Sequence, residues 1–274
     1  MAVPNIFVGY NTMYWSLYAV CIAGAISQMV LLICLIKNPL KCFRNSSTYL
    51  VANLAVCDLA VVLEMIFGMF NSLDLYVRSL SHTSFYASIL TILSIAVDRY
   101  VMVAYPFKHR LLMSGKKAGI WIVFIWIASI ASPLCHILTG TFNGISEFKY
   151  GLLATVIVLT AFLYVLTFVS LKRQAKSLAN KEEKMHAHRI RAANEERFLK
   201  TVIIVAVIAV VSLTPATIYG QVEQPGLDAK MESNALYCVL MTLLTLNFAI
   251  NPVIYFLRLK NYRKTLFIVF RCRK

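Results

Sequence analysis

The sequence predicts an all-α membrane protein, a bundle of seven transmembrane helices followed by a short amphipathic eighth helix. Three observations predict this fold. Of 274 residues, 59% are hydrophobic and only 14% are charged. The apolar residues form long blocks, and about 20 such residues cross the hydrocarbon core of a bilayer. Lys and Arg gather between alternate blocks, as in multi-pass membrane proteins.

Seven blocks are long enough to span a membrane, and the short connections between them leave no room for a soluble domain. We expect residues 1–12 to form the N-terminal segment, 13–257 the transmembrane domain, and 258–274 an amphipathic helix and tail. The predicted spans cover residues 13–36, 49–70, 75–104, 118–138, 148–171, 199–219 and 234–257.

The distribution of charge gives the orientation. A net charge of +15 would suggest nucleic acid as the partner of a soluble chain, but 24 of the 27 Lys and Arg residues fall on one side of the predicted spans. By the positive-inside rule that side is cytoplasmic, so we expect an outer N-terminus, an inner C-terminus and the plasma membrane as location. The four basic segments are 37–44, 99–117, 172–200 and 258–274.

No basic stretch precedes the first block, so we expect this span to act as its own signal. The seven cysteines show no metal-ligand spacing, and the predicted outer loops contain none, so no outer disulfide framework is expected. Cys272 follows a basic amphipathic segment, 259–270, of the kind that lies on the inner leaflet, and is a candidate palmitoylation site.

The first two spans hold few polar groups. Gly24, Ala25 and Ser27 are small residues that we expect to let a neighbouring helix approach closely. Gln28 should form hydrogen bonds within the bundle. Asp58 lies well inside the second apolar block, where an ionised carboxylate needs a cation, a hydrogen-bonding partner or a proton.

The third span ends in Asp98 and Arg99. An adjacent Asp can neutralise the Arg while part of the guanidinium takes a second partner, which favours a contact that forms and breaks. The alternative is an interfacial pair that only marks where the helix leaves the lipid. Further out on the same span, Ser88 is the hydroxyl that could reach Asp58.

The later spans add three features. Trp121 and Trp126 are interpreted as packing residues of the fourth span. The charged stretch 172–198 is rich in helix formers and is predicted to continue the fifth and sixth helices into the cytosol. Pro215 removes a backbone hydrogen bond and should kink the sixth helix, so that its inner end can swing.

Five motifs occur on these spans in a characteristic order. They are NLAVCDL at 53–59, DRY at 98–100, Trp126, Pro215, and NPVIY at 251–255. Together they resemble a rhodopsin-like (class A) G-protein-coupled receptor over nearly the whole chain. The resemblance implies a receptor that passes an extracellular ligand signal to a heterotrimeric G protein by outward movement of the sixth helix. Arrestin and a receptor kinase are further candidate partners.

The resemblance also implies roles for residues of the inner half. Arg99 would bind the G protein when active and pair with Glu195 when resting, while Tyr164 and Tyr255 would meet through water on activation. The implied coupling and switch residues are Asp98, Arg99, Tyr100, Pro106, Phe107, Tyr164, Glu195, Asn251, Pro252 and Tyr255.

A sodium site is implied as well, formed by Asp58, Ser88, Asn247 and Asn251, where the ion would favour the inactive state. A carboxylate with one hydroxyl and two amides is also a donor set that suits a hard cation. No other cofactor is expected.

Three departures from the family pattern concern mainly the outer half of the bundle and the residues that usually start activation. Asp74 stands where the family usually has a disulfide-bonded cysteine. Leu213 replaces the usual aromatic residue before the proline of the sixth span. Gln28 replaces the usual asparagine of the first span.

Four features are similar to the branch of melanocortin, lysophospholipid, cannabinoid and adenosine receptors. They are the lost cysteine bridge, the short second outer loop, the fifth span without an interior proline, and the strings ILTILSIAVDRY and FLYVLTFVSL. The melanocortin group is nearest, since it also has an aspartate at the position of Asp74. An amine receptor is disfavoured by Ser81 and an opsin by Thr245, because each lacks the residue that binds the respective ligand.

The ligand is predicted to be peptide, lipid or nucleoside-like. Glu64 and Asp74 favour a cationic peptide or amine, or else they pair with Arg78 and solvent. The predicted pocket residues are Glu64, Asp74, Arg78, Ser81, Leu213, Tyr219 and Tyr237.

The sequence bears on three other classes of protein. A transporter or channel could use Asp58 in an ion path, but the sequence has no internal repeat or pair of broken helices. A receptor-like protein that signals constitutively, or not at all, is an alternative that Leu213 and the missing cysteine keep open. An enzyme is not indicated, because no nucleophile, base and oxyanion donors converge.

Overall fold

A computed structural model describes most of the chain. The described residues are 4–43, 45–68, 75–105, 107–109, 115–139, 145–179, 200–201, 203–204, 207–208, 211–212, 214–215 and 235–270.

The elements of this part of the chain are α-helices, in agreement with the predicted all-α class. Five of their stretches are long and apolar enough to cross a membrane, as judged over the described residues alone. The ten described positions between 200 and 215, within the predicted sixth span, are also helical, and Pro215 is among them. The helices are α1 (Pro4–Lys37), α2 (Ser46–Gly68), α3 (Leu75–Ala104), α5 (Gly115–Thr139), α6 (Ile145–Ala179), α9 (Ala235–Arg258) and α10 (Lys260–Phe270).

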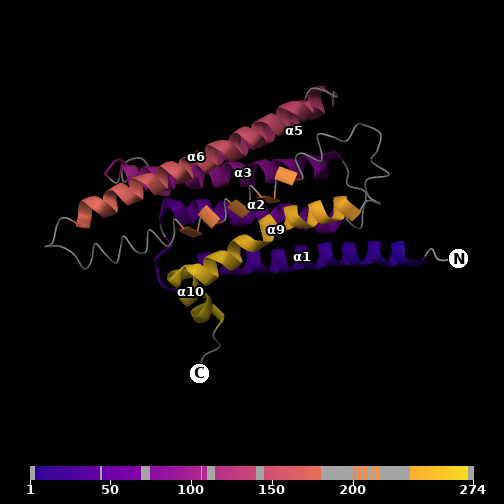
Figure 1. Cartoon of the computed structure of the whole chain (residues 1–274), viewed down its shortest axis with the longest axis horizontal. Helices are drawn as coiled ribbons and strands as arrows, with labels where there is room; N and C mark the ends of the chain where they lie inside the picture. Colours follow the sequence, from indigo (N-terminus) through magenta and orange to yellow (C-terminus); the bar gives the residue numbers. More distant parts are fainter. Residues whose placement is uncertain are drawn as a thin grey trace.

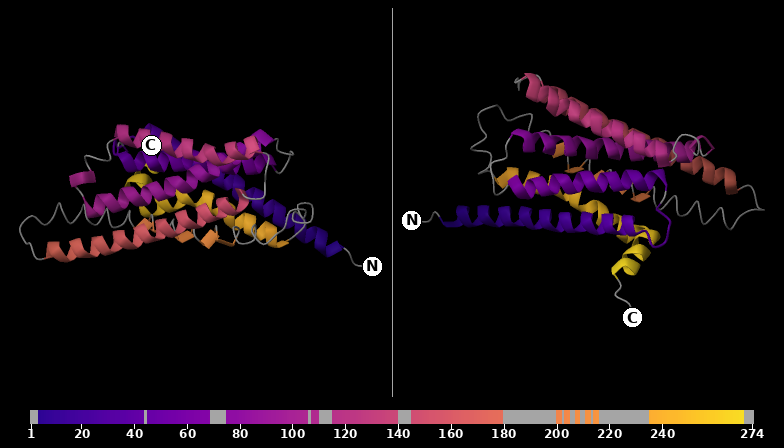
Figure 2. Two further views of the ribbon diagram at one scale, coloured as in Figure 1. Left: turned by 90° about the horizontal axis from the view of Figure 1, so that it is seen from above. Right: turned by 180° about the vertical axis from the view of Figure 1, so that it is seen from behind.

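The long helices run alongside one another in an elongated bundle (Figure 1). Helix α1 packs against α2 and α9, and α3 packs against α2, α5 and α6. Helix α10 follows α9 directly and turns away from the bundle at the end opposite the N-terminus (Figure 2). The described part of the connection between α1 and α2, one of the positively charged segments predicted to be cytoplasmic, lies at this same end, which we call the inner end.

Helices α1 and α6 extend furthest beyond the predicted spans. Helix α1 begins at Pro4, because proline fits the first turn of a helix, where its missing N–H would have no partner. Helix α6 continues to Ala179, past the predicted end of the span at residue 171. The first part of the charged stretch therefore does extend the fifth helix, as the helix-forming composition predicted.

A tight connection between α1 and α2 fixes the inner end of both helices. Asn38 and Lys41 have positive φ angles of 36° and 50°. Asparagine tolerates this conformation, and the Asn38 side chain accepts a hydrogen bond from the Phe43 N–H at 3.3 Å. Asn45 then caps α2 by accepting the Thr48 N–H at 2.9 Å. Helix α2 therefore starts at a defined place beside the end of α3.

Small residues bring α1 and α9 into close contact. A Cβ added to Gly24 would lie 2.9 Å from the Cβ of Ala249. The Ser27 hydroxyl donates a hydrogen bond to the Ala249 carbonyl across the interface at 3.0 Å. These contacts confirm that the small residues of the first span allow a neighbouring helix to approach.

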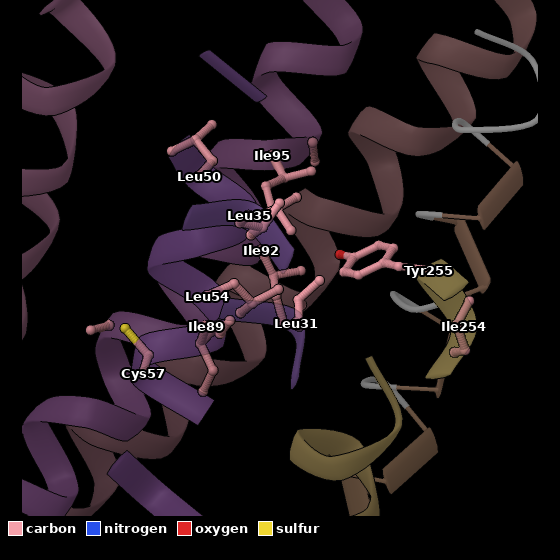
Figure 3. Close-up of a cluster of buried hydrophobic side chains, with 14 of the residues drawn as sticks. Leu31, Leu35, Leu50, Leu54, Cys57, Ile89, Ile92, Ile95, Ile254 and Tyr255 are labelled. Atoms are coloured by element: carbon pink, nitrogen blue, oxygen red, sulfur yellow. The ribbon is translucent and has the colours of Figure 1, made fainter. Parts of the chain in front are cut away.

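The main apolar core lies between α1, α2, α3 and α9. Figure 3 shows its aliphatic side chains packed between these helices, with Tyr255 of α9 pointing into the cluster. Apolar packing alone does not hold helices together in lipid, because lipid tails are equally apolar. The polar groups placed within this core are therefore important for specificity.

Candidate functional site

The Asp58 cluster is centred on a carboxylate with no exposed surface in the middle of α2. Its Oδ1 atom accepts a hydrogen bond from the Ser88 hydroxyl of α3 at 2.6 Å. Its Oδ2 atom accepts one from the Asn251 amide of α9 at 2.8 Å and one from the Gln28 amide of α1 at 3.2 Å. The contacts of Ser88 and Gln28 confirm two sequence predictions. Four helices thus meet at one buried acid.

Gln28 makes a second contact that follows from the proline in α9. Pro252 has no N–H, so the carbonyl of Phe248, four residues earlier, lacks its helical hydrogen bond. The Gln28 amide donates to this carbonyl oxygen at 2.5 Å. One side chain therefore joins the carboxylate of α2 to the proline-interrupted turn of α9.

The donor set around Asp58 fits a hard cation. The side-chain oxygens of Gln28, Asn247 and Asn251 are buried and have no hydrogen-bond partner among the described residues. Two of these oxygens belong to amides that already contact Asp58. Oxygen acceptors beside a buried carboxylate are the ligands that hard cations prefer. Asn247 is buried one turn before Asn251, but it is not among the hydrogen-bond donors to Asp58 that the described structure shows.

The Asp98 cluster lies at the inner end of the bundle, and the Asp98 side chain has no exposed surface. Arg99 Nη2 lies 3.1 Å from Asp98 Oδ2, so the predicted neighbouring pair is formed. Ser47 of α2 donates to the same oxygen at 2.6 Å, and Ser46 donates to Oδ1 at 3.2 Å. Both serines lie in the first turn of α2, where the helix dipole also favours an anion.

His109 completes this cluster and was missed by the sequence analysis. Its Nε2 atom lies 2.9 Å from Asp98 Oδ1. The ring belongs to a helical turn that follows α3, held by a backbone hydrogen bond from His109 to the Tyr105 carbonyl at 2.9 Å. Helical spacing gave no signal for this contact, because eleven residues of continuous helix span about 16 Å along the axis. The ring reaches Asp98 only because α3 ends at Ala104 and a separate helical turn follows it.

Three buried tyrosines lie within electrostatic range of Arg99. They are Tyr164 of α6, Tyr255 of α9 and Tyr262 of α10. The rings of Tyr255 and Tyr262 are 5.7 Å apart, and Tyr262 also packs on Phe43 at 4.7 Å. Burial raises the pKa of Tyr262, so its phenol stays protonated. The structure thus brings the predicted Tyr164, Tyr255 and Arg99 together.

The tryptophans of α5 anchor this helix by hydrogen bonds as well as by packing. Trp126 donates to the Asn53 side chain of α2 at 3.0 Å, and Asn53 donates in turn to Thr91 of α3 at 2.8 Å. Trp121 donates to the Ser94 hydroxyl of α3 at 2.9 Å. Helix α5 is thereby held against both α2 and α3.

The structure describes some of the remaining predicted site residues, and others lie outside its described part. Glu64 is buried on α2 against the half-buried Ser81 of α3, so two members of the predicted ligand pocket are adjacent. Tyr100 packs edge-on against Tyr105, and Phe107 is 87% exposed. Outside the described residues lie Asp74, Pro106, Glu195, Leu213, Tyr219 and Cys272, together with the side chains of Arg78 and Tyr237.

Comparison with known proteins agrees with this arrangement. Residues 29–255 match the family described as 7 transmembrane receptor (rhodopsin family). Human lysophosphatidic acid receptor 4 is 23% identical over an alignment that covers 89% of this chain and 76% of the receptor. Melanocortin receptor 4 of Danio rerio is 25% identical over 58% of this chain and 53% of the receptor. Human lysophosphatidic acid receptor 6 is 32% identical over 43% and 37%, respectively.

The match covers more than half of the chain and includes α2, α3, α5, α6 and most of α9. It confirms the resemblance drawn from the motifs and, with the helices described above, a multi-pass membrane bundle. Relatives of the lysophospholipid and melanocortin types both fall in the branch that the sequence predicted. The chain belongs to the rhodopsin family of seven-transmembrane receptors, whose members signal through G proteins.

Proposed function

We propose that this chain couples an extracellular ligand to a heterotrimeric G protein by outward movement of the inner end of the sixth helix. The observation that supports this most directly is the Asp98 cluster, in which Arg99 is buried beside its own neutralising acid at the inner end of the bundle. A charged pair in that position is costly and is a functional hypothesis by default. We place the receptor in the plasma membrane, with its N-terminus outside and its C-terminus inside.

In this proposal Arg99 changes partners. At rest it contacts Asp98 and pairs with Glu195 at the inner mouth of the sixth helix. On activation it leaves these partners and binds the G protein, while Tyr164 and Tyr255 approach each other through water. The proximity of both tyrosines to Arg99 supports this sequence of contacts. Tyr100, Pro106 and Phe107 form the adjoining contact surface, and the exposed Phe107 ring is available for it.

We further propose that Asp58, Ser88, Asn247 and Asn251 hold an allosteric sodium ion. Such an ion supplies positive charge to the buried carboxylate, and the unpaired amide oxygens support this assignment. The residues themselves hold α2, α3 and α9 together, so the ion would favour the resting arrangement.

Two ligand classes each have a supporting observation. The similarity to lysophosphatidic acid receptors over most of the chain favours a lysophospholipid. The buried Glu64 beside Ser81 favours a ligand with a cationic group, because an acid in the apolar part of a bundle is stabilised by a positive partner. Assays with lysophospholipids and with cationic peptides, on wild type and Glu64→Gln, separate the two classes.

The coupling proposal is tested by guanine-nucleotide exchange on a panel of G proteins, in membranes that contain equal amounts of each variant. We expect Arg99→Ala to abolish exchange and Glu195→Ala to raise it. Lys116→Ala, which removes an exposed cation at the start of α5, is the matched control and should behave as wild type. If wild type and all variants equal empty membranes on every G protein, the coupling proposal is wrong and the non-signalling alternative gains support.

A further inference from the structure

The Asp98 carboxylate is shared by two basic side chains that approach from different directions. Arg99 contacts Oδ2 at 3.1 Å, whereas His109 contacts Oδ1 at 2.9 Å. The remaining bonds to the two oxygens come from the serines at the start of α2, one to each. Each carboxylate oxygen thus has two partners. Asp98 retains three hydrogen bonds when Arg99 leaves, and one of them is from His109.

The chemistry of this contact determines which nitrogen of the His109 ring bears a hydrogen. A carboxylate only accepts hydrogen bonds, so the Nε2 atom that faces Asp98 must bear the hydrogen. Nδ1 is then the atom that gains or loses a proton. Gain of this proton adds a positive charge to the ring that donates to the carboxylate, which forms an ion pair and requires no movement of either side chain.

The surroundings of His109 make Asp98 its main electrostatic partner. Within the described residues, α3 presents Asp98 and the adjacent Arg99, and α2 presents the hydroxyls of its first two serines. On its own segment Lys108 is exposed, with its Nζ atom 5.5 Å from the centre of the Tyr105 ring. The His109 side chain is 15% exposed, so protons from the aqueous phase can reach it.

We propose that His109 is a positioning residue for G-protein coupling, which sets through Asp98 how readily Arg99 leaves its resting contact. When the ring is cationic it neutralises Asp98, which weakens the attraction that holds Arg99. When the ring is neutral, Arg99 is the main counter-charge and stays in place. Protonation of the ring therefore favours release of Arg99, and a fall in cytoplasmic pH favours protonation. This inference rests on the proposed coupling to a G protein.

The test measures basal nucleotide exchange between pH 8 and pH 6 in membrane fragments whose two faces are both in contact with the buffer. It compares wild type with three variants of His109. His109→Gln keeps an amide donor near the position of Nε2 but cannot gain charge. His109→Phe removes the donor, and His109→Arg carries a permanent charge. Division of each rate by that of His109→Gln at the same pH removes the pH response of the G protein itself.

We expect the ratio of wild type to His109→Gln to rise about fivefold as pH falls, the factor that corresponds to about 1 kcal/mol for a partly screened ion pair. His109→Arg should show a high rate and His109→Phe a low rate, both without this pH dependence. His82→Gln, a histidine at the outer part of α3, should keep the wild-type dependence. A constant ratio of wild type to His109→Gln overturns the inference.

The two proposals fail in different ways. If wild type exceeds Arg99→Ala at every pH but its ratio to His109→Gln does not change, only the role of His109 is wrong. If wild type never exceeds Arg99→Ala, coupling through Arg99 is absent and the role of His109 is overturned together with it.

Discussion

Gln28 shows how a single side chain joins three helices of this bundle. Its amide donates to Asp58 on α2 and to the Phe248 carbonyl on α9, which Pro252 leaves without a helical partner. In lipid no water replaces a lost partner, so an unsatisfied backbone carbonyl is costly. The glutamine at this position therefore has a stabilising role that is independent of any ligand.

We predict that Gln28→Met lowers the free energy of unfolding by about 1 to 3 kcal/mol, because it leaves a buried carbonyl and a carboxylate with one partner fewer. The measurement is thermal unfolding in detergent, followed by a thiol-reactive dye that labels the buried Cys21, Cys34 and Cys57 as they become exposed. Met29→Leu, a change on the half-exposed neighbouring residue, is the control. An unchanged melting temperature for Gln28→Met would show that Phe248 is satisfied in another way.

At the scale of the helices, α3 joins α2 to the α5 and α6 side of the described bundle. It contacts α2, α5 and α6, and it supplies Ser88, Thr91, Ser94 and Asp98 to hydrogen bonds with α2 or α5. The contact between α1 and α9 is of a different kind, because it depends on the absence of side-chain volume at Gly24. The contacts of α3 with α2 and α5 can change by exchange of hydrogen bonds. At Gly24 the contact between α1 and α9 leaves no space for a side chain.

We predict that Gly24→Val destabilises the fold by about 1 to 3 kcal/mol, since the added carbons meet Ala249 and force the helices apart. The same dye assay measures the effect. Gly119→Ala is the matched control, because a Cβ there meets nothing within 4 Å; it should leave stability unchanged or raise it by up to about 1 kcal/mol. Equal melting temperatures for both variants would contradict the close α1–α9 contact.

For the whole molecule, Asp58 and Asp98 lie at the centres of two linked regions of the bundle. Asp58 joins α1, α2, α3 and α9 in the interior, and Asp98 joins α2, α3 and the following turn at the inner end. A ligand that binds only one arrangement of the helices shifts the receptor toward it by its difference in affinity. A cation at Asp58 would act on the whole bundle in this way.

We predict that sodium stabilises the receptor against thermal unfolding when compared with choline at equal ionic strength. At a concentration ten times its dissociation constant the ion contributes about 1.4 kcal/mol. Asp58→Asn should remove the difference between the two salts and Ser88→Ala should reduce it. Ser94→Ala, on the same helix but bonded to Trp121 and Leu90, should retain it. A difference that persists in Asp58→Asn would place the sodium effect elsewhere.

Much of this protein could be predicted from the sequence, because the controlling interactions are local or set by the bilayer. Length and polarity of each block predict the spans, and the distribution of Lys and Arg predicts their orientation in the membrane. A carboxylate such as Asp58 inside an apolar helix needs a hydrogen-bonding partner, and the Ser88 hydroxyl and the Gln28 amide both donate to it. The motifs on these spans were sufficient to predict the receptor family.

Only the tertiary structure decided which residues complete each cluster. The start of α2, with its two serines, lies beside Asp98 because the turn at Asn38 and Lys41 directs it there. His109 reaches the same acid only because the chain forms one more helical turn after α3. Such contacts depend on how helices are placed relative to one another, and neither hydropathy nor a motif along one chain segment contains that information.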